Sequence, residues 1–199
     1  MTEIWAVQMQ RDLTPAQERF AKKLLPAERL ARLESAKREA EPLCAYAALR
    51  LALWKVGGLR ELPQFAMTDS GKPFFPEFPQ IFFNLSHTDG AVLTGVSPWE
   101  LGVDIEKIRP MKAAAMRRLS NETEPDAFFQ SWVRREAIAK RDGSGFRSLM
   151  EKKCPEDALY RALETFPGYT AGAAMCGSAE FMLHCCTAAE LLEELAGIL

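Results

Sequence analysis

Residues 102–106 read Gly-Val-Asp-Ile-Glu, and this alternation of apolar and acidic side chains constrains the fold more than any other segment. The period is that of a half-buried strand, so we expect Val103 and Ile105 to face a core and Asp104 and Glu106 to share the opposite face. Side chains two residues apart on one strand face lie roughly 6.5–7 Å apart at the backbone. The segment therefore predicts two carboxylates that can hold one small divalent cation between them. Both side chains are expected to face a water-filled cleft rather than the core.

A second segment, residues 132–140, is predicted to be helical. Trp132, Glu136 and Lys140 recur every four residues and so fall on one stripe of that helix. A strand with two carboxylates and a helix with a third, all beside a cation, form the donor set of a magnesium site for phosphate chemistry. Each piece also has a plainer interpretation. An Asp-x-Glu strand is more often a solvent-facing acidic edge, and a Glu-x-x-x-Lys pair is usually an ordinary helix salt bridge.

Length and composition indicate a soluble globular chain. Its 199 residues can form one large domain or two small lobes, and they suffice to bury a core. Hydrophobic residues make up 48% and charged residues 26%, and the net charge of −2 indicates neither a nucleic acid nor a membrane as partner. No stretch reaches the ~20 apolar residues of a membrane-spanning helix. The N-terminal residues are too mixed for a signal peptide.

Two local features of the composition also bear on function. The five cysteines are scattered and lack metal-ligand spacing, so we expect reduced thiols in a cytoplasmic protein. Basic residues cluster in one early stretch, for which a solvated helix face is the commoner explanation. That cluster comprises Arg29, Arg32, Lys37 and Arg38.

The pattern along the chain alternates strands with helices. Capping boxes are expected where Thr14 precedes Gln17 and where Thr123 precedes Asp126, the second opening the long helix that carries Glu136. Thr187 should cap a last short helix. Strands are expected at 4–9, 81–85, 91–96, 101–105, 168–175 and 180–186, and helices at 24–36, 42–56, 111–119 and 191–195, with a turn at 70–73.

Both halves of the chain run from helix to strands, which allows an α+β fold of two similar α/β lobes. We expect pseudo-twofold symmetry between the lobes and a cleft between them. The N-terminal lobe would cover residues 1–99 and the C-terminal lobe residues 100–199. The second lobe would begin with the acidic strand.

Three motifs, in this order, resemble those of 4′-phosphopantetheinyl transferases of the surfactin-synthetase-activating type. They are Phe-Asn-Leu-Ser-His at 83–87, Gly-Val-Asp-Ile-Glu at 102–106 and Trp-Val-Arg-Arg-Glu-Ala-Ile-Ala-Lys at 132–140. The family typically shows F-N-x-S-H, G-[IV]-D-[IVL]-E and W-x-x-K-E-[AS]-x-x-K. The resemblance extends to Gly-Lys-Pro at 71–73, Gly-Tyr at 168–169 and the closing Glu-Leu-Leu helix, so it spans nearly the whole chain.

The resemblance implies a magnesium-dependent enzyme. Such an enzyme transfers the phosphopantetheine arm of coenzyme A to a serine of an apo acyl or peptidyl carrier protein and releases adenosine 3′,5′-bisphosphate. By the same resemblance, Asp104, Glu106 and Glu136 would bind Mg²⁺. Glu136 would also act as general base for the carrier serine, directly or through a metal-bound water. The chain would act as a monomer, because smaller relatives build the same cleft by oligomerising.

The resemblance also implies which residues contact coenzyme A. Lys140 would reach a phosphate oxygen, and His87, assisted by Ser86, would donate to the pyrophosphate. The turn formed by Lys72 and Pro73 would lie near the adenosine 3′-phosphate. Arg29 and Arg32 occupy the stretch where the family usually places basic residues for that same phosphate, which gives the basic cluster a function. Glu136, Lys140 and His87 would be the catalytic residues.

The sequence departs from the family pattern at three places. Arg135 stands where most members carry lysine, and the two side chains differ in geometry. Glu-Pro-Leu at 41–43 occupies the region where the family often has a further arginine. The segment between Glu106 and Trp132 is shorter than in many relatives. Because that segment lies toward the carrier protein in the family, carrier preference is expected to differ.

Two other functional classes remain open at this point. One is a non-catalytic module that binds coenzyme A or a carrier protein with the same fold. The other is an unrelated magnesium-dependent phosphohydrolase, which would need no protein docking face. Turnover of coenzyme A only in the presence of an apo carrier separates all three hypotheses. The sequence does not identify the carrier.

Overall fold

The computed structural model describes residues 1–9, 13–33, 40–145, 157, 159–177 and 180–198, and these form a mixed α+β fold with three sheets. The elements are β1 (Thr2–Gln8), α1 (Pro15–Lys23), α2 (Ala27–Leu33), α3 (Ala40–Gly57), β2 (Ala66–Met67), β3 (Pro73–Phe74), β4 (Phe82–Thr88), β5 (Ala91–Ser97), β6 (Leu101–Lys107), α4 (Ala113–Leu119), α5 (Pro125–Asp142), β7 (Tyr160–Leu163), β8 (Tyr169–Met175), β9 (Phe181–Thr187) and α7 (Ala188–Ile198).

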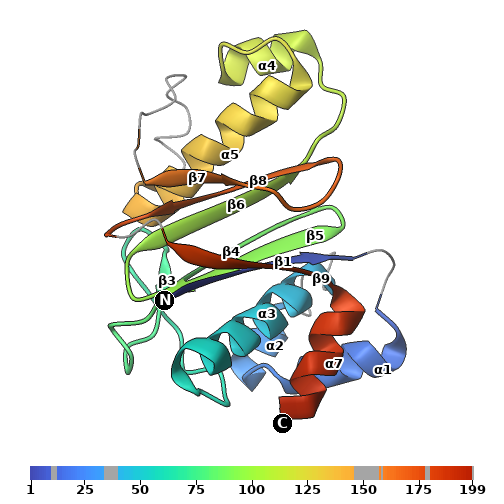
Figure 1. The fold of residues 1–199 in the computed structure, drawn as a ribbon, viewed down its shortest axis with the longest axis vertical. Coiled ribbons are helices and arrows are strands. Elements are labelled where there is room, and N and C mark those ends of the chain that lie inside the picture. The colour runs from blue at the N-terminus through green and yellow to red at the C-terminus, as the bar shows by residue number, and fades with distance from the viewer. Residues whose placement is uncertain (10–12, 34–39, 146–156, 158, 178–179, 199) are drawn as a thin grey trace.

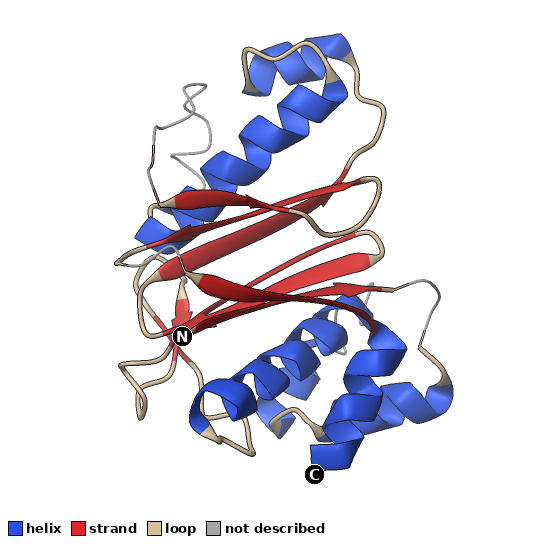
Figure 2. Cartoon of the chain, viewed as in Figure 1, coloured by secondary structure: helices blue, strands red, loops and turns tan. Residues whose placement is uncertain are grey.

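The two larger sheets face each other in the middle of the molecule, and helices cover their outer faces (Figures 1 and 2). Helices α1, α2, α3 and α7 lie on one side, and α5 lies on the other. The apolar cluster between the sheets includes Ile4, Leu93, Val103 and Ile105, each fully buried. Alternation along β1 explains the layering, because Trp5 points away from this cluster into the helical layer. The α+β class predicted from the sequence is confirmed.

The two sheets share a local strand order. The first runs β4-β5-β1-β9 and the second runs β6-β8-β7. In the first sheet, β1 lies antiparallel to β5, the second strand of the β4–β5 hairpin. In the second sheet, β6 lies antiparallel to β8, the second strand of the β7–β8 hairpin. Strand β9 pairs in parallel with β1, and α7 packs on α3. A division of the chain at residues 99 and 100 therefore does not follow the sheets, because the last strand and helix join the first sheet and its helices.

Two of the three expected helix caps are confirmed. Thr14 and Gln17 form both hydrogen bonds of a capping box, and Thr187 and Glu190 exchange the same pair of bonds. The cap expected at Thr123 is wrong, since the N-cap of α5 is Glu124, which makes no side-chain cap bond. Pro125 explains the shift, because the residue before a proline is driven into the extended conformation that an N-cap adopts.

Most expected strands and helices match within a few residues, with informative exceptions. The strand expected at 81–85 continues to Thr88, and strand β7 was not predicted from the sequence. The helix expected at 24–36 is seen as α2, and residues 34–36 lie outside the described part of the chain. No helix within the described ranges has both the length and the apolar character needed to cross a bilayer.

Candidate functional site

Strand β6 carries the two acidic residues predicted to bind a metal. Val103 and Ile105 are fully buried between the sheets, as the alternation predicted. Asp104 is only 2% exposed, whereas the side chain of Glu106 is 22% exposed. The expectation that both carboxylates face a water-filled cleft is therefore wrong for Asp104. Its burial arises because β4 and α5 both pack against this strand.

Close packing at Gly102 brings α5 onto β6. A Cβ at this position would collide with the carbonyl oxygen of Ala137 and the backbone nitrogen of Arg141. Only glycine therefore allows the helix to approach this near, because it carries no side chain. The contact places the stripe of α5 that carries Glu136 and Lys140 beside Asp104.

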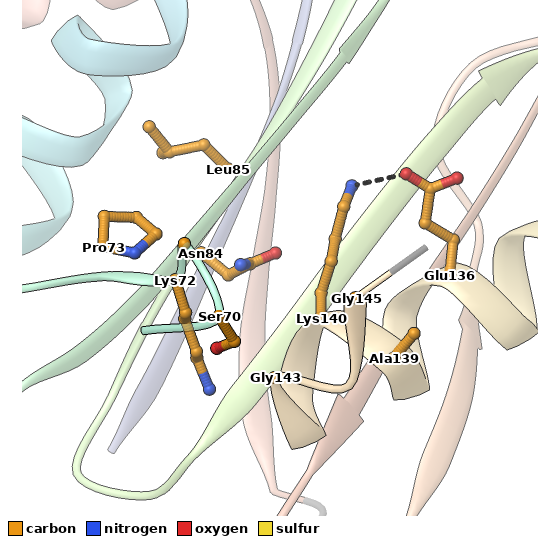
Figure 3. A pocket seen from close by; sticks show the side chains of 11 residues that line it. Ser70, Lys72, Pro73, Asn84, Leu85, Glu136, Ala139, Lys140, Gly143 and Gly145 are labelled. Carbon is orange, nitrogen blue, oxygen red and sulfur yellow. Dashed lines mark ion pairs between the residues drawn. The ribbon is translucent and has the colours of Figure 1, made fainter. Parts of the chain in front are cut away.

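Lys140 lies at the centre of the resulting polar cluster. Its Nζ lies 2.8 Å from Oδ1 of Asp104 and 3.3 Å from Oε1 of Glu136. It also donates to Oγ of Ser86 at 3.1 Å and to the backbone oxygen of Val103 at 3.3 Å. Figure 3 shows Glu136 and Lys140 side by side on α5, joined by the ion pair. The cluster thus joins β4, β6 and α5.

Burial and mutual repulsion shift the protonation of this cluster. Burial raises the pKa of Glu136, and the neighbouring carboxylates of Asp104 and Glu106 raise it further, while Lys140 opposes the shift. Burial alone would lower the pKa of Lys140, but Asp104 and Glu136 outweigh it and raise that pKa. A carboxylate with a raised pKa is better matched to accepting a proton near neutral pH.

The donor set fits a hard cation, although the ligands are not assembled around one position. Among the described residues, no three His, Cys, Asp or Glu side chains converge as an ion would require, and the ammonium of Lys140 lies between Asp104 and Glu136. Oδ2 of Asp104 is buried without a hydrogen-bond partner. Such an orphaned carboxylate oxygen needs a cation or donor, and an all-oxygen set suits magnesium better than zinc.

Strand β4 brings a row of polar side chains to the cluster. Ser86 donates to Oδ1 of Asp104 at 2.7 Å, so its hydroxyl proton is directed to a carboxylate of the cluster. By strand alternation His87 points to the other face of β4, where it is partly exposed. Partial desolvation lowers the pKa of its imidazole; Glu41 opposes this shift, and Lys140 adds to it. Asn84 and Thr88 were not expected at the site, although they share one face of β4 with Ser86 at every second position. That alternation was the available signal.

A pocket of about 390 Å³ opens beside the cluster (Figure 3). The turn between β2 and β3 forms one wall and the C-terminal end of α5 forms the other. Nζ of Lys72 donates to the backbone oxygen of Arg141 at 2.6 Å and so provides a partner for a carbonyl in the last turn of α5. The lining residues are Ser70, Gly71, Lys72, Pro73, Asn84, Leu85, Glu136, Ala139, Lys140, Gly143 and Gly145. Three residues expected to contact coenzyme A thus line one cavity: Lys72, Pro73 and Lys140.

Of the two arginines expected at the adenosine end, the structure describes the side chain of Arg29. Arg29 lies on α2 with its guanidinium 4.4 Å from the centre of the Phe65 ring, so its charge is stacked on an aromatic face. The side chain of Arg32 lies outside the described part of the chain. Arg135 is buried and donates to the backbone oxygen of Leu119 at 2.9 Å. It thereby ties α4 to α5, which gives this departure from lysine a structural role.

Comparison with known proteins gives several relatives of one kind. The chain is 32% identical over 154 residues to the 4′-phosphopantetheinyl transferase AcpT of Salmonella typhimurium, covering 61% of this chain and 80% of that protein. It is 39% identical over 101 residues to AcpT of Escherichia coli K12, covering 43% and 51% of the two chains.

The relatives from Bacillus match over a shorter part. The 4′-phosphopantetheinyl transferase Sfp of Bacillus subtilis is 29% identical over 94 residues, covering 41% of this chain and 42% of that protein. The match thus spans about two fifths of the length of these relatives. No protein-family model matches the chain.

Proposed function

Because this chain belongs to the 4′-phosphopantetheinyl transferase family, we propose that it transfers the 4′-phosphopantetheine moiety of coenzyme A to a serine of an apo carrier protein. Adenosine 3′,5′-bisphosphate would be the second product. The observation that carries the proposal is the convergence of Asp104, Glu136 and Lys140 beside a pocket lined by the Gly-Lys-Pro turn. Family membership supports the reaction type, and this geometry supports the choice of residues.

Glu136 is proposed as the general base for the carrier serine. Its raised pKa, due first to burial and then to repulsion from Asp104, favours proton uptake more than an ordinary exposed carboxylate would. The side chain lines the pocket, so a hydroxyl entering from that side can approach it. Lys140 sits one turn further along α5 and carries a positive charge that can hold a phosphate oxygen.

Asp104, Glu106 and Glu136 are proposed to hold Mg²⁺ together with the pyrophosphate of coenzyme A. When bound, the ion would neutralise the pyrophosphate and the charge that develops on the transferred phosphoryl group. The orphaned Oδ2 of Asp104 supports this assignment, since the protein leaves it without a donor of its own. The ammonium of Lys140 would then be available to a phosphate oxygen.

The remaining substrate contacts are proposed on both sides of the pocket. His87 and Ser86 would serve the pyrophosphate, and Lys72 with Pro73 would serve the adenosine 3′-phosphate. Arg29 and Arg32 would add positive charge at that end. Support comes from the pocket lining for Lys72 and Pro73 and from the contact between Ser86 and Lys140. Several cations suit a ligand with three phosphate groups.

The two sheets with their helices are proposed to be pseudo-symmetric halves of one catalytic unit. The matching strand orders β4-β5-β1 and β7-β8-β6 support this, as do the 18-residue helices α3 and α5 that cover them. A single chain with both halves is proposed to act as a monomer. Among the described cysteines, Cys44, Cys176, Cys185 and Cys186 are free thiols, which suits the cytoplasm.

The proposal is tested by incubating the protein with coenzyme A, Mg²⁺ and a panel of apo carrier proteins, then weighing the carriers. A mass gain of one phosphopantetheine group on the carrier serine is expected, with equimolar adenosine 3′,5′-bisphosphate. Hydrolysis of coenzyme A without a carrier would instead indicate a phosphohydrolase. Binding of coenzyme A without turnover by any carrier would indicate a non-catalytic module.

A further inference from the structure

The two sheets are joined at their edges by side chains of β4. Strand β4 is the edge of the first sheet and β6 is the edge of the second. Three backbone N–H groups of β6, those of Val103, Ile105 and Lys107, point toward β4. They donate to Oδ1 of Asn84 at 3.0 Å, to Oγ of Ser86 at 3.4 Å and to Oγ1 of Thr88 at 3.4 Å. Every second residue of one edge thus pairs with every second residue of the other.

Two of these three β4 side chains also donate hydrogen bonds to carboxylates of β6. Ser86 donates its single proton to Oδ1 of Asp104 at 2.7 Å, and Thr88 donates its proton to Oε2 of Glu106 at 3.2 Å. Each hydroxyl therefore accepts from one residue of β6 and donates to the acidic residue before it. A hydroxyl has one proton, so these two bonds fix its orientation. The third side chain, Asn84, accepts from the N–H of Val103 and has no carboxylate partner on β6.

Both contacts to Glu106 fall on the same oxygen. Arg109 donates to Oε2 at 3.2 Å, as Thr88 does, and neither contacts Oε1. The side chain of Arg109 is 55% exposed, and exposed ion pairs hold geometry weakly. Thr88 is attached to a strand that is hydrogen-bonded along its length to β5. It is therefore the more rigid of the two partners of Glu106.

We propose that Thr88 is a positioning residue that fixes the rotamer of Glu106 and presents its second oxygen, Oε1, for cation binding. The inference rests on the proposed magnesium-dependent function, because Glu106 is assigned there as a ligand. Partners that orient a ligating carboxylate commonly change metal affinity by 10–100-fold when removed. Ser86 stands in the same relation to Asp104, but it also contacts Lys140, so Thr88 gives the cleaner test.

Thr88→Val removes the hydroxyl at nearly constant shape, and Thr88→Ser keeps it. The matched control is Thr94→Val, because Thr94 is fully buried on β5 and donates its hydroxyl to the backbone oxygen of Ala45, on α3. Binding of Mn²⁺ to each variant in the presence of coenzyme A is measured by electron paramagnetic resonance. The signal of the free ion decreases as Mn²⁺ binds. The Mg²⁺ concentration for half-maximal transfer and the thermal midpoint are measured in parallel.

Thr88→Val is expected to weaken Mn²⁺ binding by about tenfold and to raise the half-saturating Mg²⁺ concentration similarly. Thr88→Ser should restore both values, and Thr94→Val should lower the thermal midpoint while leaving both unchanged. Equal Mn²⁺ affinity in Thr88→Val and the unmodified protein overturns the positioning role. An equal loss of Mn²⁺ affinity in Thr94→Val would show that the effect of Thr88→Val reflects lower stability and not the positioning of Glu106. If the unmodified protein neither binds Mn²⁺ nor transfers phosphopantetheine, the proposed function itself fails.

Discussion

Lys140 and Asp104 form an ion pair of 2.8 Å between α5 and β6, and the carboxylate of this pair is 3% exposed. The most buried acid of the candidate site is therefore neutralised by a residue of the same site. Two residues proposed to bind metal and phosphate therefore also have a structural role, because removing either partner leaves the other in a poorly hydrated position.

Asp104→Ala should consequently destabilise the fold as well as abolish transfer. The loss is expected to be about 2 kcal/mol, since Lys140 loses its closest partner and keeps only the longer 3.3 Å contact to Glu136 and two neutral acceptors. Asp142→Ala is a suitable control, because Asp142 pairs with Arg141 but its side chain is 46% exposed, and it should cost well under about 1 kcal/mol. Thermal denaturation measures both. A stable Asp104→Ala protein would show that the pair contributes little to the fold.

Glu136→Gln should lower kcat by about 100-fold or more while changing the affinity for coenzyme A little, because the amide cannot accept the serine proton. Glu18→Gln on α1 is the matched control, since Glu18 forms the same i,i+4 pair with Lys22 at 2.6 Å on an exposed helix face. Steady-state kinetics and calorimetric binding of coenzyme A separate the two effects. A variant with altered affinity but normal kcat would mean that another group takes the proton.

Gly102→Ala should be severely destabilising, because the new methyl group would meet the backbone of α5 at Ala137 and Arg141. Backbone cannot move aside as a flexible side chain can, so a loss of about 3 kcal/mol or more is expected. Gly197→Ala, in α7, is the counterpart: its Cβ would meet nothing within 4 Å, and it should be neutral or stabilising by up to about 1 kcal/mol. Similar thermal midpoints for the two variants would contradict the close contact.

Asp157 should make stability depend on pH. Burial alone would raise its pKa, but the hydrogen bonds from Arg141 and from the N–H of Leu159 outweigh burial and lower it. A lowered folded-state pKa means that this stabilisation is complete above the unfolded pKa of about 3.9. It is lost as pH falls through the folded value. The thermal midpoint of the unmodified protein should therefore fall more steeply below about pH 4 than that of Asp157→Asn.

The exposed Asp69→Asn variant is the control for this pH series, since Asp69 lies in the turn before β3. Its acid profile should follow that of the unmodified protein. Parallel profiles for Asp157→Asn and the unmodified protein between pH 6 and 3 would show that the bridge to Arg141 contributes nothing to acid sensitivity.

Lys72→Ala should raise the KM for coenzyme A and leave the KM for 3′-dephospho-coenzyme A nearly unchanged, if Lys72 serves the 3′-phosphate. It should also cost about 1 kcal/mol of stability, because its hydrogen bond to the carbonyl of Arg141 is lost. Lys55→Ala removes a lysine that pairs with Glu194 on the helical layer and should change neither KM. An equal rise of KM with both substrates would remove the 3′-phosphate assignment.

Local patterns in the sequence predicted the features that depend on a few neighbouring residues. The alternation at 102–106 predicted the buried faces of Val103 and Ile105, and Thr14 with Gln17 predicted the start of α1. These features depend on backbone geometry over a few residues, so the residues concerned are sufficient to specify them. The three ordered motifs likewise indicate the family without any knowledge of tertiary contacts.

Only the tertiary structure decided what lies opposite each of those faces. Asp104 alternates as a solvent-facing acid would, but β4 and α5 bury it, and Ser86 and Lys140 take one of its oxygens. The parallel pairing of β9 with β1 likewise brings residues nearly 180 positions apart into one sheet. The periodicity of apolar and polar residues predicts which face of its strand or helix a side chain occupies. The identity of the neighbour depends on long-range packing, in which strands and helices distant in sequence meet to bury apolar surface and satisfy exposed edges.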